Sequence, residues 1–87
     1  MRTSKQEIRT WLEEAKAAGA THMLVVDDTF DHEDYPVNVP KDKDPHEVVK
    51  KYSNMSMQKV MEVYDLSMDI EQQLSEFRAF HLPKRNQ

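Results

Sequence analysis

The sequence contains no cysteine and only one glycine in 87 residues. Without cysteine the chain has no disulfide, no thiolate metal ligand and no cysteine nucleophile, and a reducing compartment is the default. The single glycine, Gly19, excludes the glycine-rich loops that cradle phosphates and dinucleotides. The longest uninterrupted apolar stretch, Met23 to Val26, is too short to span a membrane, and the N-terminal residues lack a signal-length apolar run. We therefore expect a cytoplasmic protein with no membrane partner.

Charge and length narrow the function classes further. Sixteen acidic and twelve basic residues give a formal net charge of −4, which speaks against a nucleic acid as the partner, because such binding relies on neutralising phosphates. A chain of this size has few elements from which to build a core, a pocket and a set of catalytic groups together. A binding module needs only one surface. The sequence thus favours a non-enzymatic binding protein with no cofactor.

Three segments carry the start signals and apolar spacing of helices. Ser4 and Glu7 form a capping box, and Gly19 falls where a helix needs a left-handed C-terminal residue, so we expect a first helix over residues 5–18. Asp44 followed by Pro45 begins a second helix that ends near 53–54. Asp69 begins a third, whose apolar stripe runs through Ile70, Leu74, Phe77 and Phe80 and which Pro83 stops.

The segment from Thr21 to Val39 has the pattern of a β-hairpin. Residues 22–28 and 35–39 are its two strands, and the polar residues 31–34 between them are difficult to bury. Residues 57–66 fit a helix or a strand equally well by periodicity, and we expect a strand because Val60, Val63 and Tyr64 favour pleated surfaces.

These elements predict a single α+β domain over residues 1–87 with the order α-β-β-α-β-α, the last residues, 84–87, being a frayed tail. A right-handed crossover through the second helix would place the third strand beside the first, giving a mostly antiparallel sheet of order 2-1-3. We expect the helices to pack mainly on one face of the sheet. The other face, near Met23 and Val25, would then stay partly bare and suit a partner or a second copy of the chain in a homodimer.

Four segments, GATHMLVVDDTFD (19–31), EDYPV (33–37), VMEVY (60–64) and FRAFH (77–81), resemble small bacterial and phage proteins to which no activity is attached. The similarity spans most of the chain. It implies no catalytic residue, and it implies a phage or prophage accessory protein that binds and modulates a host component.

The acidic hairpin loop and the aromatic residues that flank it are the candidate interaction surface. Aromatic side chains beside charged ones are typical of binding hot spots, and an acidic loop suits a basic protein partner. We expect that partner to meet the following residues: Phe30, Asp31, His32, Glu33, Asp34 and Tyr35.

Two other functions compete with this interpretation. Asp27, Asp28 and Asp31 offer hard oxygen ligands at a strand end, as a metal-dependent hydrolase or metal-binding protein would need, although the spacing is not that of an EF-hand. A small-ligand site at a homodimer interface is the third hypothesis.

The histidines and methionines give weaker signals. His22, His32, His46 and His81 are scattered, with no pair at zinc-binding helical spacing, and His22 beside the central strand is expected to be the most buried. Met55, Met57, Met61 and Met68 are expected to fill gaps in the core, the alternative being an adaptable binding surface.

Overall fold

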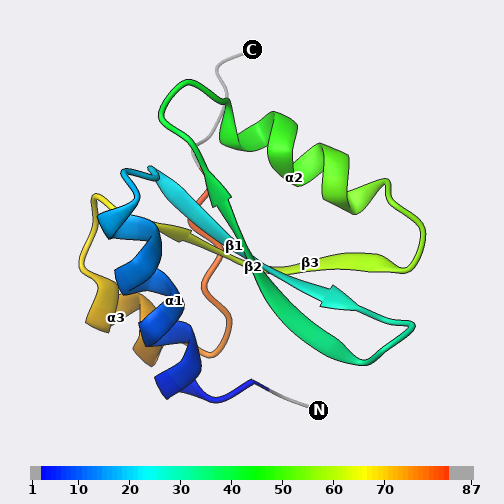
Figure 1. Cartoon of the computed structure of the whole chain (residues 1–87). Helices are drawn as coiled ribbons and strands as arrows, with labels where there is room; N and C mark the ends of the chain where they lie inside the picture. Colours follow the sequence, from blue (N-terminus) through cyan, green and yellow to red (C-terminus); the bar gives the residue numbers. More distant parts are fainter. Residues whose placement is uncertain (1–2, 83–87) are drawn as a thin grey trace.

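The computed structural model describes residues 3–82 and has the α+β order expected from the sequence (Figure 1). The 84–87 tail and Pro83 lie outside the described residues. The third strand, which periodicity alone could not assign, is confirmed. The six elements are α1 (Lys5–Ala17), β1 (His22–Asp28), β2 (Glu33–Val39), α2 (Pro45–Ser53), β3 (Gln58–Asp65) and α3 (Ile70–Ser75).

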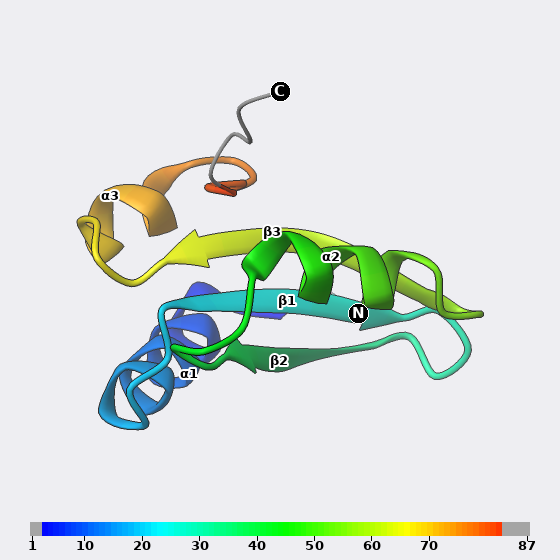
Figure 2. The same cartoon turned by 90° about the horizontal axis from the view of Figure 1, so that it is seen from above.

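The three strands form a sheet in the order β2-β1-β3, and β1 is antiparallel to both neighbours (Figure 2). In this register Asp27 lies opposite Asp34 on β2, and Val25 lies opposite Glu62 on β3. A bulge interrupts the β1–β3 pairing between Val25 and Val26. Because β2 and β3 both pair with β1 and are joined through α2, the unit is a split β-α-β, as the sequence predicted.

Helices cover both faces of the sheet. Two of the three, α1 and α3, pack on the face that carries Met23, Val25 and Tyr64, and all three of these residues are buried. The prediction that the Met23 and Val25 face stays bare is therefore wrong. The opposite face, which carries Leu24 and Val26, is covered by α2 (Figure 1). Alternation along β1 gives apolar side chains to both faces, so this central strand requires a cover on each side.

The ends of α1 follow the sequence signals. Ser4 accepts a hydrogen bond from the Glu7 amide at 3.2 Å, as a capping residue does. At the other end Gly19 has φ +82°, and the Ala20 amide donates to the Ala15 carbonyl at 3.0 Å, which closes the helix with a left-handed residue. The face between these ends buries Leu12 completely, a contribution of about 1.5–3 kcal/mol for one such side chain.

The last helix is shorter than its apolar stripe predicts. It ends at Ser75, and the exposed fractions of Phe77 and Phe80 are 79% and 51%, so neither belongs to a buried helical face. Residues 79–81 instead lie along the outer edge of β3 (Figure 2). There the Val63 amide donates to the Ala79 carbonyl at 3.0 Å, and the His81 amide donates to the Val63 carbonyl at 2.9 Å. Pairing with the edge strand supplies hydrogen bonds that a longer helix would have supplied locally.

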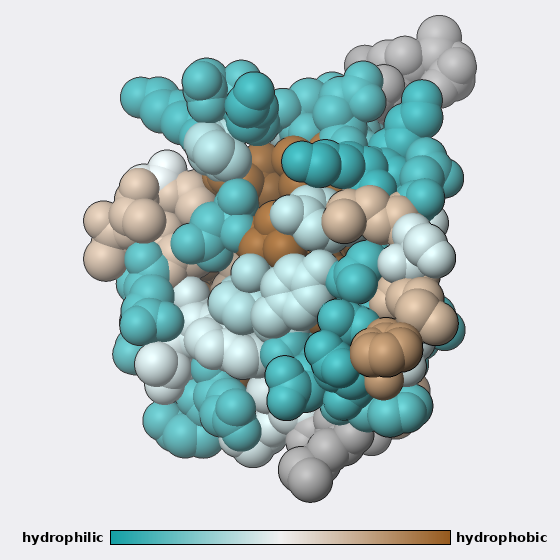
Figure 3. All heavy atoms as spheres, turned by 45° about the vertical axis from the view of Figure 1, so that its right-hand side comes forward, coloured by the Kyte–Doolittle hydropathy of each residue, from teal (hydrophilic) through white to brown (hydrophobic). Residues whose placement is uncertain are grey.

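One side of the molecule has a mostly polar surface. Figure 3 shows one side on which hydrophilic residues predominate and hydrophobic ones form small separate areas. None of the helices within residues 3–82 has the length and apolar character needed to cross a membrane.

Candidate functional site

The turn of the β1–β2 hairpin is held by the carboxylate of Asp28. Its Oδ1 accepts the backbone amides of Phe30 at 2.9 Å and of Asp31 at 3.3 Å, an arrangement that replaces the missing glycine of a tight turn. The chain then passes through His32 in the left-handed region, with φ +58°, before β2 begins. This local bonding sets the direction in which Phe30 projects.

A second loop lies beside this turn, at the same end of the sheet (Figures 1 and 2). Thr29 donates its amide at 2.8 Å and its hydroxyl at 3.1 Å to the carbonyl of Met57, in the loop between α2 and β3. Met57 itself has φ +63°, which is uncommon for a side chain of this size and costs conformational energy. The two loops are therefore joined by the Thr29 hydrogen bonds at a residue, Met57, whose backbone conformation is strained.

Large apolar side chains are exposed on both loops. The exposed fractions are 70% for Phe30, 53% for Met57 and 42% for Met55. Met68 is also exposed, so the prediction that these methionines fill the core is wrong for three of the four. Asp31 and Glu33 are exposed next to Phe30. We call Phe30, Asp31, Glu33, Met55 and Met57 the hairpin-end surface.

The six residues expected to form one surface do not all face the same way. Phe30, Asp31, His32 and Glu33 are exposed at the turn, but Asp34 and Tyr35 are partly buried on opposite faces of the sheet. The Tyr35 hydroxyl donates to the Gln58 side chain, and its ring meets the Tyr52 ring edge-on at 6.5 Å. Burial raises the pKa of Tyr35, with further contributions from Tyr52 and Asp28. Tyr35 thus anchors the hairpin to α2.

Asp34 lies instead on the face that α1 covers, where it lines a cleft of about 320 Å³. Two further carboxylates, Asp27 and Glu62, line the same cleft. The Thr3 hydroxyl donates to Asp34 Oδ2 at 2.7 Å. The sequence predicts Asp27 and Asp34 within one acidic loop segment but gives no sign of Glu62, which only the strand register brings beside them.

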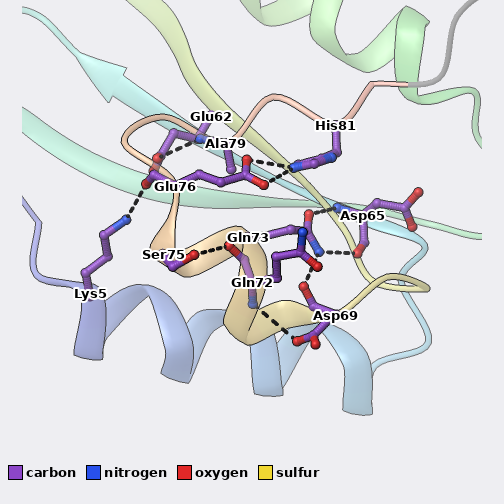
Figure 4. A network of polar contacts seen from close by, with 10 residues as sticks. All are labelled: Lys5, Glu62, Asp65, Asp69, Gln72, Gln73, Ser75, Glu76, Ala79 and His81. Carbon is purple, nitrogen blue, oxygen red and sulfur yellow. Dashed lines mark hydrogen bonds and ion pairs between the residues drawn. The ribbon is translucent and has the colours of Figure 1, made fainter.

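The remaining lining of this cleft consists of apolar residues, basic residues and His32. Ile8 and Val25 are nearly completely buried, while Met61 and Phe77 complete the apolar lining. Two basic residues, Lys5 and Arg78, also line it. The Lys5 ammonium donates to the backbone carbonyl of Glu76 at 3.1 Å (Figure 4).

The three aspartates expected to hold a metal ion do not converge. Asp27 and Asp28 are consecutive strand residues, so their side chains point to opposite faces. Asp28 already accepts the turn amides, and Asp31 is exposed. Within residues 3–82 no group of three or more histidines and carboxylates is placed to hold a metal ion.

A second polar network joins α3 and the following segment to β3 (Figure 4). His81 Nε2 lies 2.9 Å from Glu76 Oε1. The Gln73 side chain is buried, accepting the Asp65 amide at 2.8 Å and donating to the Asp65 carbonyl at 2.9 Å. Both polar atoms of this side-chain amide are hydrogen-bonded to backbone groups, so Gln73 has a structural role and not a binding role.

Two buried polar atoms in the described part of the chain have no hydrogen-bond partner: Nε2 of His22 and the hydroxyl of Tyr64. The burial of His22 confirms the sequence prediction, and this atom lies 3.7 Å from Asp65 Oδ2. Burial, with the nearby Glu62 and Glu76 carboxylates, raises the pKa of Tyr64. Neither atom lines the cleft.

Comparison with known proteins does not assign a function to these residues. No protein-family model, curated protein or solved structure matches the chain significantly.

Proposed function

We propose that this chain is a non-enzymatic protein-interaction module that presents the hairpin-end surface to a basic partner protein. The observation that carries the proposal is the exposure of Phe30 and Met57 on two loops joined by the Thr29 hydrogen bonds. Exposed aromatic and methionine side chains gain free energy when a partner removes them from water. If the chain is a phage protein, as its resemblance to small phage proteins implies, the partner would be a host component.

Both loops are held by hydrogen bonds within the chain itself. Phe30 lies in a turn whose amides bond to Asp28, and Met57, which has a left-handed backbone, accepts the hydrogen bonds of Thr29 with its own carbonyl. Preorganisation lowers the entropy lost on binding, so more of the contact energy appears as affinity. Strained backbone at an exposed apolar residue has no evident benefit to folding, which supports a role in binding.

The charge of the surface indicates the chemistry of the partner. Asp31 and Glu33 follow Phe30 in the same turn and are exposed, and the whole chain carries a formal net charge of −4. Complementary charge steers association and excludes acidic competitors. The expected partner surface therefore combines lysine or arginine residues with an apolar pocket for Phe30.

Site-specific photocrosslinking tests this proposal. Benzoylphenylalanine replaces Phe30 in one protein and Phe80, another exposed phenylalanine outside the hairpin-end surface, in a matched control. In lysate of the encoding organism, the probe at position 30 should give one dominant crosslinked protein that the probe at position 80 does not give. That product should decrease when Asp31→Asn and Glu33→Gln are added. Identical products at both positions, or none at position 30, would refute the proposal.

A further inference from the structure

Histidines take part in most of the ion pairs of this fold. Four ion pairs are found within residues 3–82, and a histidine is the cationic partner in three of them. Because histidine side chains ordinarily gain or lose their charge between about pH 5 and 8, these three pairs are ionic only on the acid side of that range. Two of the three, His22 with Asp65 and His81 with Glu76, border the last residues of β3. Both imidazoles interact electrostatically with Asp65.

The pair of His81 and Glu76 holds a segment against the edge of the sheet. We call residues 76–82 the edge segment. Glu76 is the C-terminal cap of α3, and Nε2 of His81 lies 2.9 Å from its Oε1 and 3.1 Å from its Oε2 (Figure 4). Between these two residues the backbone reaches β3, where Val63 exchanges hydrogen bonds with Ala79 and His81. A protonated imidazole attracts the carboxylate with its charge as well as with its N–H, so the proton strengthens this attachment.

His22 is the buried counterpart on β1. It lies directly opposite Asp65 in the strand register, and its Nε2 is 3.7 Å from Asp65 Oδ2. This nitrogen has no hydrogen-bond partner, whereas the other nitrogen, Nδ1, lies 3.0 Å from the Thr21 hydroxyl. A neutral imidazole carries one N–H, but the protonated ring donates from both nitrogens. Proton uptake therefore lets Nε2 donate to Asp65 while Nδ1 donates to Thr21.

The charged groups around the two imidazoles are mostly carboxylates. Besides Asp65 and Glu76, the Glu62 carboxylate of β3 accepts a backbone amide of the edge segment at 3.4 Å. From α1, the Lys5 ammonium bonds to the Glu76 carbonyl, and Arg78 of the edge segment is exposed. The face of the sheet that carries Leu24 is covered by residues of α2: Val48, Val49 and Tyr52. Two imidazolium charges would thus be added to a region that already holds three carboxylates.

We propose that His22 and His81 form a proton-operated latch on β3. With both rings protonated, His22 ties the start of β1 to the end of β3, and His81 holds the edge segment on the outer side of that strand. The closed latch binds the two protons more tightly than the open one, so closure is favoured in mild acid and weakened as the pH rises. Below about pH 4, protonation of the carboxylates removes the same attractions. The latch does not depend on the proposed function.

Amide hydrogen exchange measures opening of the latch at the bonds that it protects. The amides of Val63 and His81 bond across the edge segment, and the Leu66 amide donates to the Thr21 carbonyl at 3.0 Å. Protection factors, which divide out the intrinsic effect of pH on exchange, are compared at about pH 5.5 and about pH 8. All three should fall about fivefold at the higher pH, the loss of a charge-assisted contact. The Thr29 amide, bonded to the loop at the other end of the sheet, should keep its protection factor.

Glutamine variants separate the proton from the packing of the ring, because glutamine keeps an N–H donor but does not become charged. His81→Gln should remove the pH dependence at Val63, and His22→Gln should remove it at Leu66. The matched control is His46→Gln, whose ion pair lies at the start of α2, and it should leave both amides as they are in the original chain.

Glu76→Gln removes the second pair from its acidic side, and it serves where His81→Gln does not fold. It should also remove the pH dependence at Val63. Protection factors of Val63 and Leu66 that stay constant with pH in the original chain would overturn the inference. A pH dependence that survives both histidine substitutions would overturn it as well.

Discussion

Asp27 and Asp34 lie directly opposite each other on β1 and β2, and both carboxylates line the same cleft. Like charges in this position raise the free energy of the folded state, an effect that Lys59, opposite Asp27 on β3, offsets only in part. We expect Asp27→Asn to increase the free energy of unfolding by about 0.2–1 kcal/mol, the range of cross-strand pair energies. Urea denaturation at low and high salt measures this, and the gain should shrink as salt screens the repulsion.

Asp31→Asn is the control for that experiment, because Asp31 is exposed at the turn and faces no strand neighbour. Its substitution should change stability by less than about 0.5 kcal/mol. A destabilised Asp27→Asn would contradict the repulsion and would indicate that the carboxylate is needed for folding.

Gln73 should be one of the most sensitive polar positions. Its buried side chain satisfies both the amide and the carbonyl of Asp65, at the junction of β3 and α3, and also donates to the Asp69 carbonyl at 3.2 Å. Gln73→Ala leaves these backbone groups without partners, a loss of about 1–3 kcal/mol for a buried unsatisfied group. Chemical denaturation of Gln73→Ala against Gln72→Ala, its exposed neighbour, measures the difference. Equal effects would show that water replaces the amide.

Gly19 permits a clean measurement of backbone strain. A methyl group added at Gly19 would meet nothing within 4 Å, so Gly19→Ala creates no clash. Its φ of +82° is nevertheless unfavourable for alanine, and we expect a loss of about 1–2 kcal/mol in unfolding free energy. Thermal unfolding of Gly19→Ala and of Gly19→Asn tests this, since asparagine tolerates left-handed backbone better and should lose less.

Protonation of the Asp65 carboxylate should account for part of the loss of stability in acid. Burial alone would raise the pKa of its carboxyl, but hydrogen bonds from the hydroxyl and amide of Ser67, with His22 and His81 nearby, bring the pKa below the ordinary value of 3.8. The folded state then binds this proton less readily than the unfolded state does. The resulting stabilisation is fully present above pH 3.8 and is lost as the pH falls through the lower pKa of the folded state.

Denaturation curves of Asp65→Asn at pH 7 and at pH 3 check this sign. The variant should lose less stability between the two pH values than the original chain does, because it has no proton to take up at this position. Asp42→Asn, at an exposed loop position, should keep the original pH dependence. The same pH dependence in Asp65→Asn as in the original chain would contradict the role assigned to Asp65.

The helices and strands were largely predictable because their signals are local. Ser4, Asp44 and Asp69 each cap the helix that the sequence assigned to them, and Gly19 ends the first. Such signals depend on hydrogen bonds between residues a few positions apart. The α3 boundary was wrong because Phe77 and Phe80 continue an apolar stripe, whereas pairing of 79–81 with β3 involves residues distant in sequence.

The cleft could not have been found by spacing. Asp27 and Asp34 are seven positions apart, and their meeting depends on a hairpin register that a shift of one residue would destroy. Glu62 joins them only because β3 pairs with β1 with a bulge after Val25. The sequence did identify the exposed turn at Phe30, since polar residues between two apolar runs require no long-range contact.

The short pairing of residues 79–81 with β3 has a consequence for the protein at high concentration. That segment covers one edge of the sheet, and the strand at the other edge is β2, which contains Pro36. Proline offers no N–H to an incoming chain at β2, and residues 79–81 already pair with Val63 of β3, so neither edge is a good template for adding further strands. Fibril growth by edge-to-edge pairing of folded molecules should therefore be slow. Deletion of the segment that contains residues 79–81 should accelerate it.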